Sequence, residues 1–349
     1  MPTSASSGNS VRETRFFPSD RPAPPHRSVP RALITGITGQ DGSYLSEHLL
    51  ARGYEVHGLV RHPAGLASTR IAGWIDRMTL HPADLGDSRH LGVLLRRIEP
   101  DEVYHLAAQT HVAASVTDPL ATLDLNILGT ARLLDACRRC PRPPRFFHAS
   151  TSLIFGEPDA FPQDEGTPLR PVNPYGASKA CATDLVRIAR ETEGLFLVNG
   201  ICYNHESPRR DPGFVTAKIC AAAARIRQGR QKTLLIGDVA ARRDWGDARE
   251  FVAGFWAALQ ADQPADYVFA TGVLHSVEEV LSIAFRTVGL DWREHVQTDP
   301  ALFRAVDPNR LVGNSTRALR TLGWRASTRF EDLIAEMTHA ALASPRVSG

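Results

Sequence analysis

The sequence of 349 residues is poor in cysteine, with five, and in methionine, with three, and its aromatic content is 7%. An odd number of cysteines without regular spacing argues against a disulfide framework and fits a reducing compartment, so we expect a cytoplasmic protein. The 40 basic and 38 acidic residues leave a net charge of +2, which provides no basic field for a nucleic-acid partner. The apolar runs are far shorter than the roughly 20 residues that span a membrane.

Two short patterns could suggest a metal site. Cys137-Arg-Arg-Cys140 has the C-x-x-C spacing, but neither a second pair nor a histidine partner accompanies it. His205-Glu206 lacks the second histidine of a zinc-binding helix. We therefore expect no metal, and we interpret the two cysteines as thiols on a helix surface.

The chain does contain a regular alternation of strand-like and helix-like segments from Arg31 onward. The expected strands are 32–35, 55–60, 78–82, 102–106, 145–150 and 195–203. This alternation predicts an α/β fold with a doubly wound parallel (Rossmann) sheet, whose ligands bind at the carboxyl ends of the strands. Beyond residue 203 the regularity fades, which predicts a smaller C-terminal substrate-binding lobe with helices near 215–228, 276–288 and 330–343.

These patterns divide the chain into three parts. Residues 1–30, rich in serine, proline and arginine, are expected to form a flexible extension. Residues 31–203 are expected to form mainly the Rossmann domain. Residues 204–349 are expected to form mainly the substrate-binding lobe, with some Rossmann elements interleaved.

The first expected strand runs into three glycines, Gly36, Gly39 and Gly42, and a helical pattern follows from Tyr44 to Leu50. The glycines allow a tight turn and the close approach of a phosphate. Backbone N–H groups and the positive end of the helix dipole then face the mouth of the turn. This G-x-x-G-x-x-G turn predicts a site for the pyrophosphate of a dinucleotide.

Arg61, at the end of the second expected strand, bears on the choice of dinucleotide. An acidic residue at this place accepts a hydrogen bond from the ribose of NAD, whereas an arginine suits the 2′-phosphate of NADP. Arg61 therefore indicates NADP, the alternative being a solvated arginine at a strand end. Asp84 follows the third strand and is expected at the edge of the adenine.

A tyrosine and a lysine have the spacing of a proton-transfer pair. Tyr175 follows Pro174 at the expected start of a helix, and Lys179 lies one turn later on the same face. An ammonium there favours the phenolate and lowers the pKa of the tyrosine. The phenol can then exchange a proton with a substrate hydroxyl while hydride moves between the same carbon and nicotinamide. Thr151, after the fifth strand, offers a hydroxyl to hold the substrate oxygen.

Together these motifs resemble the extended short-chain dehydrogenase/reductases and, among them, the GDP-mannose 4,6-dehydratases. The similarity runs nearly from Arg31 to Met337 and is most specific in Asn204-His-Glu-Ser-Pro-Arg-Arg210 and Arg243-Asp-Trp-Gly246. The resemblance implies NADP as cofactor and a GDP-hexose substrate that is oxidised at C4 and then loses water across C5–C6. It also implies a homodimer or homotetramer.

The resemblance implies a set of contact residues. Those for the cofactor are Gly36, Thr38, Gly39, Gln40, Asp41, Gly42, Arg61, Asp84, Leu85, Leu106, Ala107, Ala108, Tyr175 and Lys179. Those for the substrate are Ser152, Asn204, Arg209, Arg210, Lys218, Arg243, Arg304 and Asp307. For any single arginine the alternative is a surface salt bridge.

The sequence departs from the resemblance at one position with chemical consequences. The dehydratases carry a glutamate two residues after the catalytic threonine, where it removes the C5 proton and helps to eliminate the C6 hydroxyl. Here that residue is Leu153, which can transfer no proton, and Glu157 is expected to face elsewhere. We therefore predict C4 oxidoreduction without ordinary dehydration, by a 4-keto reductase or an epimerase. The alternatives are a dehydratase with a substitute base and a non-catalytic binder of nucleotide sugars.

Overall fold

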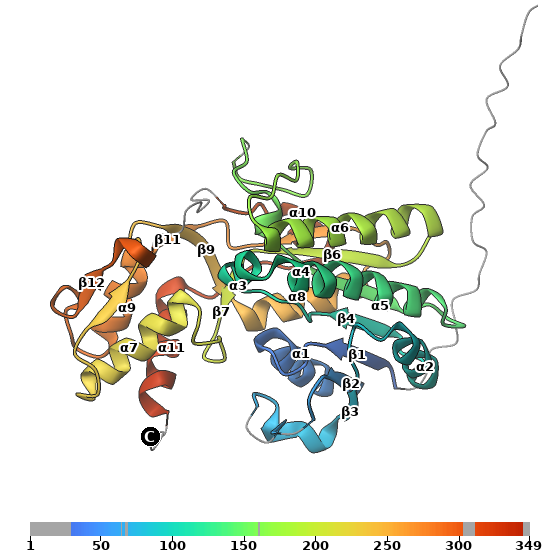
Figure 1. Cartoon of the computed structure of the whole chain (residues 1–349), viewed down its shortest axis with the longest axis horizontal. Helices are drawn as coiled ribbons and strands as arrows, with labels where there is room; N and C mark the ends of the chain where they lie inside the picture. Colours follow the sequence, from blue (N-terminus) through green and yellow to red (C-terminus); the bar gives the residue numbers. More distant parts are fainter. Residues whose placement is uncertain (1–28, 64, 67–68, 160, 303–310, 345–349) are drawn as a thin grey trace, which may run out of the picture.

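The computed structural model describes residues 29–63, 65–66, 69–159, 161–302 and 311–344. These residues form a long sheet between two layers of helices, with a smaller lobe beyond one end of it (Figure 1). Most of the predicted extension lies outside the described residues. So do two predicted substrate contacts, Arg304 and Asp307.

The central sheet has seven parallel strands in the order β10-β6-β5-β4-β1-β2-β3, which confirms the predicted Rossmann architecture. The strands are β1 Arg31–Thr35, β2 Glu55–Val60, β3 Thr79–Pro82, β4 Glu102–His105, β5 Arg145–Thr151, β6 Leu197–Cys202 and β10 Asp266–Phe269. Six of them lie within two residues of the predicted ends. The seventh, β10, was not predicted.

Helices cover both faces of this sheet because its strands are apolar on both sides. On one face lie α1 Gln40–Leu50 and α8 Ala248–Gln260. On the other lie α2 Ser88–Ile98, α5 Gly129–Arg138 and α6 Pro174–Glu193. Between β4 and α5 the chain forms the short helices α3 Val112–Thr117 and α4 Pro119–Leu123 and a π-helical turn at Asp124–Leu128.

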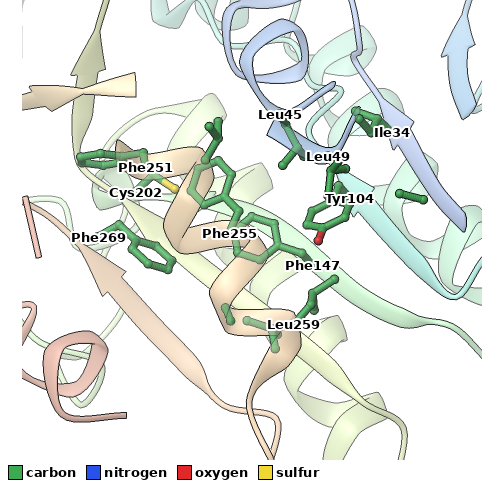
Figure 2. Close-up of a cluster of buried hydrophobic side chains, with 14 of the residues drawn as sticks. Ile34, Leu45, Leu49, Tyr104, Phe147, Cys202, Phe251, Phe255, Leu259 and Phe269 are labelled. Atoms are coloured by element: carbon green, nitrogen blue, oxygen red, sulfur yellow. The ribbon is translucent and has the colours of Figure 1, made fainter. Parts of the chain in front are cut away.

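Buried aromatic rings hold α8 and β10 against the rest of the sheet (Figure 2). The ring of Phe147 on β5 stacks on that of Phe255 on α8 with centroids 4.5 Å apart, and Phe255 meets Phe269 of β10 edge to face at 5.6 Å. All three side chains are fully buried. This packing fixes the edge strand β10 beside β6, and the chain enters the lobe from the end of β6.

The lobe contains two small sheets and a three-helix core. One sheet has the order β11-β9-β7, from Leu274–Ser276, Arg242–Asp247 and Asn204–Glu206, and the other pairs β8 Leu234–Ile236 with β12 Val296–Thr298. The helices α7 Val215–Arg227, α9 Val277–Thr287 and α11 Phe330–Ala343 pack on one another within one residue of their predicted bounds (Figure 1). Helix α10 Thr316–Leu322 returns to β10.

The remaining described elements are 3₁₀ turns at Ala72–Arg77, Ser152–Ile154, Trp292–Glu294 and Pro300–Leu302. None of the helices in the described ranges is both long enough and apolar enough to cross a bilayer.

Cys137 and Cys140 do not lie on a helix surface as predicted. Both are buried, at 3% and 6% exposure, because the end of α5 packs on α2. Burial raises the pKa of the Cys137 thiol well above its ordinary value. Across the described ranges, no three His, Cys, Asp or Glu side chains gather in a way that could hold a metal ion.

Candidate active site

A cavity of about 990 Å³ opens where the carboxyl ends of the central strands meet the lobe. Its wall includes residues from the turns after β1, β2, β4 and β5 on the sheet side. On the lobe side it includes residues of β7, α7 and β9. This volume is at the upper end of the roughly 300–1,000 Å³ usual for small-molecule sites.

The glycine turn after β1 is shaped for a phosphate. Gly36 has φ +72°, and a Cβ atom added there would lie 2.8 Å from the Ala107 nitrogen. A Cβ atom at Gly42 would lie 2.3 Å from the Gly36 oxygen. Gly39 precedes α1 without a side-chain cap, so it provides no side-chain acceptor for the first N–H groups of the helix beside the cavity. The turn therefore fits the pyrophosphate of a dinucleotide.

Most of the predicted cofactor contacts do line this cavity. They are Gly36, Thr38, Gly39, Gln40, Asp41, Gly42, Arg61, Leu85, Leu106, Ala107, Ala108, Tyr175 and Lys179. Asp84 is not among the lining residues: its carboxylate accepts the Gly86 N–H at 2.7 Å and is exposed. Asp84 therefore shapes the turn after β3 and leaves Leu85 to face the cavity.

A second arginine, which the sequence analysis did not single out, lies over the glycine turn. Arg70 lines the cavity and donates hydrogen bonds to the Thr38 oxygen at 3.3 Å and to the Arg209 oxygen at 2.6 Å. Its position in an irregular segment carried no pattern by which to find it. Arg61 and Arg70 together give this part of the wall two guanidinium groups.

Thr151, Tyr175 and Lys179 meet in the cavity wall, although they come from two elements. Asn173 caps α6 by accepting the Gly176 N–H at 2.8 Å, and Pro174 occupies the first helical position. Tyr175 thus stands at the start of the helix, and its side chain is hydrogen-bonded to that of Thr151 at the end of β5.

Burial governs the ionisation of this pair. It raises the pKa of Tyr175 to about 12, against the opposing effect of the hydrogen bond with Thr151. It lowers the pKa of Lys179 to about 8. The sequence-based expectation was that Lys179 lowers the pKa of the tyrosine, whereas in this structure the desolvation of Tyr175 raises that pKa. Tyr175 is therefore protonated at neutral pH and able to donate a proton.

A polar network joins the start of α1 to strand β7 beside the cavity. His205 Nε2 lies 2.9 Å from Asp41 Oδ2, and its ring stacks on Phe251 with centroids 4.5 Å apart. Gln40 donates to the His205 oxygen at 3.0 Å and accepts a bond from Ser207 at 2.8 Å. The side chains of Gln40 and Asp41 therefore hold the nucleotide turn against the lobe.

Asp41 and His205 determine each other's charge in this network. Although burial opposes both shifts, His205 lowers the pKa of Asp41, and Asp41 raises the pKa of His205. Both groups are therefore charged in the intermediate pH range. Sequence reasoning missed this pair, since its two members are 164 residues apart.

The two adjacent arginines of the lobe have different surroundings. Arg209 forms two hydrogen bonds of 2.9 Å with the carboxylate of Glu47 on α1 and lies over the Tyr44 ring at 4.0 Å. Arg209, which the sequence analysis expected as a substrate contact, is not among the residues that line the cavity. Arg210 does line the cavity, where its guanidinium lies 3.7 Å from the centre of the Phe214 ring.

The other predicted substrate contacts divide in the same way. Asn204, Lys218 and Arg243 line the cavity. Lys218 donates to the Leu235 oxygen at 2.8 Å, which leaves its ammonium further donors. Ser152 is not a lining residue and is buried in the 3₁₀ turn after β5.

Leu153 lines the cavity next to this catalytic group. Its carbonyl oxygen lies so close to α6 that a Cβ atom added at Gly176 would be 2.6 Å from it. Glu157, as expected, is exposed and is not a lining residue. Leu153 therefore lines the cavity two residues beyond Thr151, and it also packs against a cluster of buried apolar side chains.

The carboxylates in the described part of the wall are already engaged. Asp41 pairs with His205, and Glu206 is buried, where Thr216 donates to it at 2.5 Å and the Arg210 guanidinium forms an ion pair with it at 3.1 Å. Asp211 accepts the Gly213 N–H at 2.9 Å, and Asp238 accepts the Ala240 N–H at 2.8 Å. Glu206 thus joins α7 and Arg210 to strand β7.

Two solved structures have the same arrangement of elements. The Pseudomonas aeruginosa RMD complexed with NADPH has a TM-score of 0.77 at 26% identity, covering 90% of this chain and 100% of that one. The dTDP-glucose 4,6-dehydratase DesIV of Streptomyces venezuelae, with NAD and TYD bound, has a TM-score of 0.79 at 27% identity, covering 89% of this chain and 96% of that one.

Sequence comparison narrows the family further. The GDP-mannose 4,6 dehydratase family matches residues 33–337. The chain is 45% identical over 318 residues to GDP-mannose 4,6 dehydratase 2 of Arabidopsis thaliana, covering 88% of this chain and 85% of that one. It is 41% identical over 336 residues to the human GDP-mannose 4,6 dehydratase, covering 88% and 90%. The chain thus belongs to the GDP-mannose 4,6-dehydratase family, within the nucleotide-sugar-modifying enzymes of the short-chain dehydrogenase/reductase fold.

Proposed function

We propose that the protein catalyses NADP(H)-dependent oxidation or reduction at C4 of a GDP-linked hexose without ordinary dehydration, as a 4-keto reductase or an epimerase. The observation that carries the proposal is Leu153. It lines the cavity together with Thr151 and Tyr175, and the resemblance to the dehydratases implies a glutamate base at its position.

The proposed cofactor is NADP. The structural relatives bind NADPH or NAD, which supports a nicotinamide cofactor. The glycine turn fits its pyrophosphate, and Arg61 and Arg70 can pair with a 2′-phosphate. When bound, this cofactor accepts hydride from a hydroxyl-bearing carbon or returns it to a carbonyl carbon.

The proton chemistry belongs to the chain itself. Thr151 holds the C4 oxygen of the sugar, and Tyr175 exchanges a proton with that oxygen. Lys179, one turn along α6, provides the positive charge that favours the phenolate when Tyr175 has given up its proton. Asn204, Arg210, Lys218 and Arg243 are proposed to bind the GDP group, because amide, ammonium and guanidinium donors suit a diphosphate.

Dehydration would need a further group to take the proton from C5. A leucine cannot do this, and the four carboxylates in the described wall have partners already. The names of the relatives favour a second candidate function, a GDP-mannose 4,6-dehydratase with a substitute base. The two functions differ in whether water is lost.

Mass spectrometry after incubation with GDP-mannose and NADP tests the proposal. We expect no dehydrated product from the unaltered protein and weak but measurable loss of water from Leu153→Glu, because a new carboxylate seldom has ideal geometry. Leu153→Gln is the matched control, because glutamine has nearly the same shape as glutamate but carries no carboxylate to accept a proton. Robust dehydration by the unaltered protein would establish the second candidate instead.

We further propose a homodimer or homotetramer in the cytoplasm. Large apolar side chains stand exposed on the outer helices, with Leu120 at 77% and Val116 at 63%. Leu128 and Ile188 are nearly half exposed on the same side of the central sheet. Such side chains are suited to contact with a second copy. The five cysteines are free, which supports a reducing compartment.

A further inference from the structure

Two segments contact the start of α6 and bring apolar side chains to the reacting centre. The Tyr175 N–H donates to Ser115 Oγ on α3 at 3.2 Å, and α3 contributes Val112 and Ala113 to the cavity wall. The Leu153 carbonyl lies against Gly176, and Leu153, which is partly buried, is a residue of the cavity wall as well. The hydroxyls of Thr151 and Tyr175 therefore have apolar surface beside them.

This surface constrains the sugar. If Thr151 and Tyr175 hold the C4 oxygen, a side chain two residues beyond Thr151 faces the carbons next to C4 and the groups attached to them. A hexose with all its hydroxyls would turn one of them toward Leu153, where it loses its water and gains no hydrogen bond. A methyl group at C6 would instead gain from burial against leucine.

We propose that the substrate is a GDP-linked 4-keto-6-deoxyhexose, which the enzyme reduces at C4 to the 6-deoxyhexose. This inference rests on the proposed C4 oxidoreduction and specifies its substrate. The geometry that supports it is the juxtaposition of Leu153, Val112 and Ala113 with the Tyr175–Thr151 pair.

The reaction balances with one co-reactant. The π bond of the C4 carbonyl breaks, its carbon receives a hydride with two electrons, and its oxygen receives the proton of Tyr175 Oη. NADPH is oxidised to NADP⁺, and Tyr175 regains a proton from water. A 4-keto-6-deoxyhexose arises when a hexose loses water across C5–C6, so a separate dehydration of a GDP-hexose must supply this substrate.

A matched pair of sugars tests the inference. GDP-mannose and GDP-6-deoxymannose differ in the C6 hydroxyl alone, and oxidation of each by NADP⁺ at alkaline pH is followed by nicotinamide absorbance. The C4 epimers of these two GDP-sugars are measured in the same way. Reduction of GDP-4-keto-6-deoxymannose by NADPH is measured as well. We expect kcat/KM to favour the 6-deoxy sugar by about 10–100-fold, the range in which an apolar pocket discriminates against an added hydroxyl.

Variants at Leu153 test whether this residue of the cavity wall causes the preference for the 6-deoxy sugar. Leu153→Asn is similar in shape and offers hydrogen bonds, so the preference for the 6-deoxy sugar should fall at least about fivefold, whereas Leu153→Met should retain it. Binding of GDP to each variant shows that it is folded. A preference unchanged in Leu153→Asn would overturn the role of Leu153.

The possible outcomes distinguish a failure of the proposed 6-deoxy substrate from a failure of the proposed C4 oxidoreduction. Equal kcat/KM for the two members of a pair would overturn the 6-deoxy substrate and leave C4 oxidoreduction standing. Absence of hydride transfer with either pair and with the 4-keto sugar would overturn the proposed function itself.

Discussion

The Tyr175 phenol and the Lys179 amine are both buried, and burial moves their pKa values in opposite directions. Burial thereby favours the neutral form of each group, because a neutral group loses less hydration free energy than a charged one when water is removed. At neutral pH this favours Tyr175 as the donor of a proton. Below pH 8 Lys179 is charged, and burial makes that charge unfavourable for the fold.

Replacing Tyr175 with phenylalanine should separate chemistry from binding. The ring keeps its packing but loses the proton, so hydride transfer should fall by roughly 10²–10⁴-fold. GDP affinity, measured by calorimetry, should remain within about threefold. Near-normal turnover of Tyr175→Phe would show that another group transfers the proton.

Lys179→Met should make the protein more stable and inactive. The folded pKa of about 8 lies below the ordinary lysine value of 10.5, so protonated Lys179 destabilises the fold at every pH below 8. The variant should gain up to ~3 kcal/mol in free energy of unfolding at pH 7. That gain should shrink as pH rises from 8 to 10.5. Urea unfolding at pH 7 and pH 10 measures it, and a loss of stability at pH 7 would contradict the expectation.

Arg61 and Arg70 should decide the choice between NADP and NAD. Each guanidinium can pair with a 2′-phosphate that NAD lacks, so alanine at either position should weaken NADP binding about tenfold or more and NAD binding little. Arg52→Ala, whose guanidinium lies over the Trp256 ring, is a control for the loss of a surface arginine. Equal affinity of the unaltered protein for the two cofactors would remove the basis of the assignment.

At the scale of elements, the junction of α1 with β7 depends on charge rather than on apolar contact. Asp41 and His205 are 2.9 Å apart, and Arg209 adds a second link from the lobe to Glu47. These bonds join the turn that fits the pyrophosphate to the strand that carries Asn204. The nucleotide turn and the lobe are therefore coupled through α1.

His205→Gln should destabilise the protein in a pH-dependent way. The raised pKa of His205 contributes stability below its ordinary value of 6.5, and this contribution is lost as pH rises through the folded pKa. The lowered pKa of Asp41 contributes above 3.8 and is lost as pH falls through its folded pKa. The loss should therefore be largest between about pH 4 and 6.5, on the order of 3 kcal/mol.

Urea unfolding of His205→Gln at pH 5.5 and 8.5 measures this difference. His275→Gln is the matched control, because His275 pairs at 3.1 Å with Glu279, whose side chain is 47% exposed. That variant should change stability by less than about 1 kcal/mol. A loss for His205→Gln that is the same at both pH values would show that the pair contributes through packing alone.

At the scale of the whole molecule, Leu120 and Val116 are exposed on helices that pack beside α6. If these helices contact a second copy, Leu120→Asp should shift the mass in solution toward the monomer, because a buried unpaired carboxylate is costly. Light scattering measures this shift. Val93→Asp, at an exposed position on α2, is the control, and a monomeric unaltered protein would contradict the proposal.

Much of the fold and of the site followed from local pattern. The strands from β1 to β6 were predictable because each is a short apolar run bounded by turns and helices. Tyr175 and Lys179 were predictable because a helix brings positions one turn apart to the same face. Leu153 was visible as a departure because it follows Thr151 within one turn. These features depend on neighbours in the chain.

The rest depended on distant partners. Strand β10 has four residues and is completed by pairing with β6, where Asp266 lies opposite Asn199. Arg209 and Arg210 are identical by local pattern, yet Glu47 on α1 holds the first away from the cavity, while Phe214 and Glu206 hold the second within it.

The sequence by itself determined the parallel sheet, the glycine turn and the placement of Tyr175 and Lys179 on one face of a helix, since short-range periodicity and backbone sterics suffice for them. Tertiary structure alone decided which charged side chains reach the cavity and how far burial moves the pKa values of Tyr175 and Lys179. Desolvation and ion pairing depend on what the whole fold places around each group, and no local stretch of the sequence carries that information.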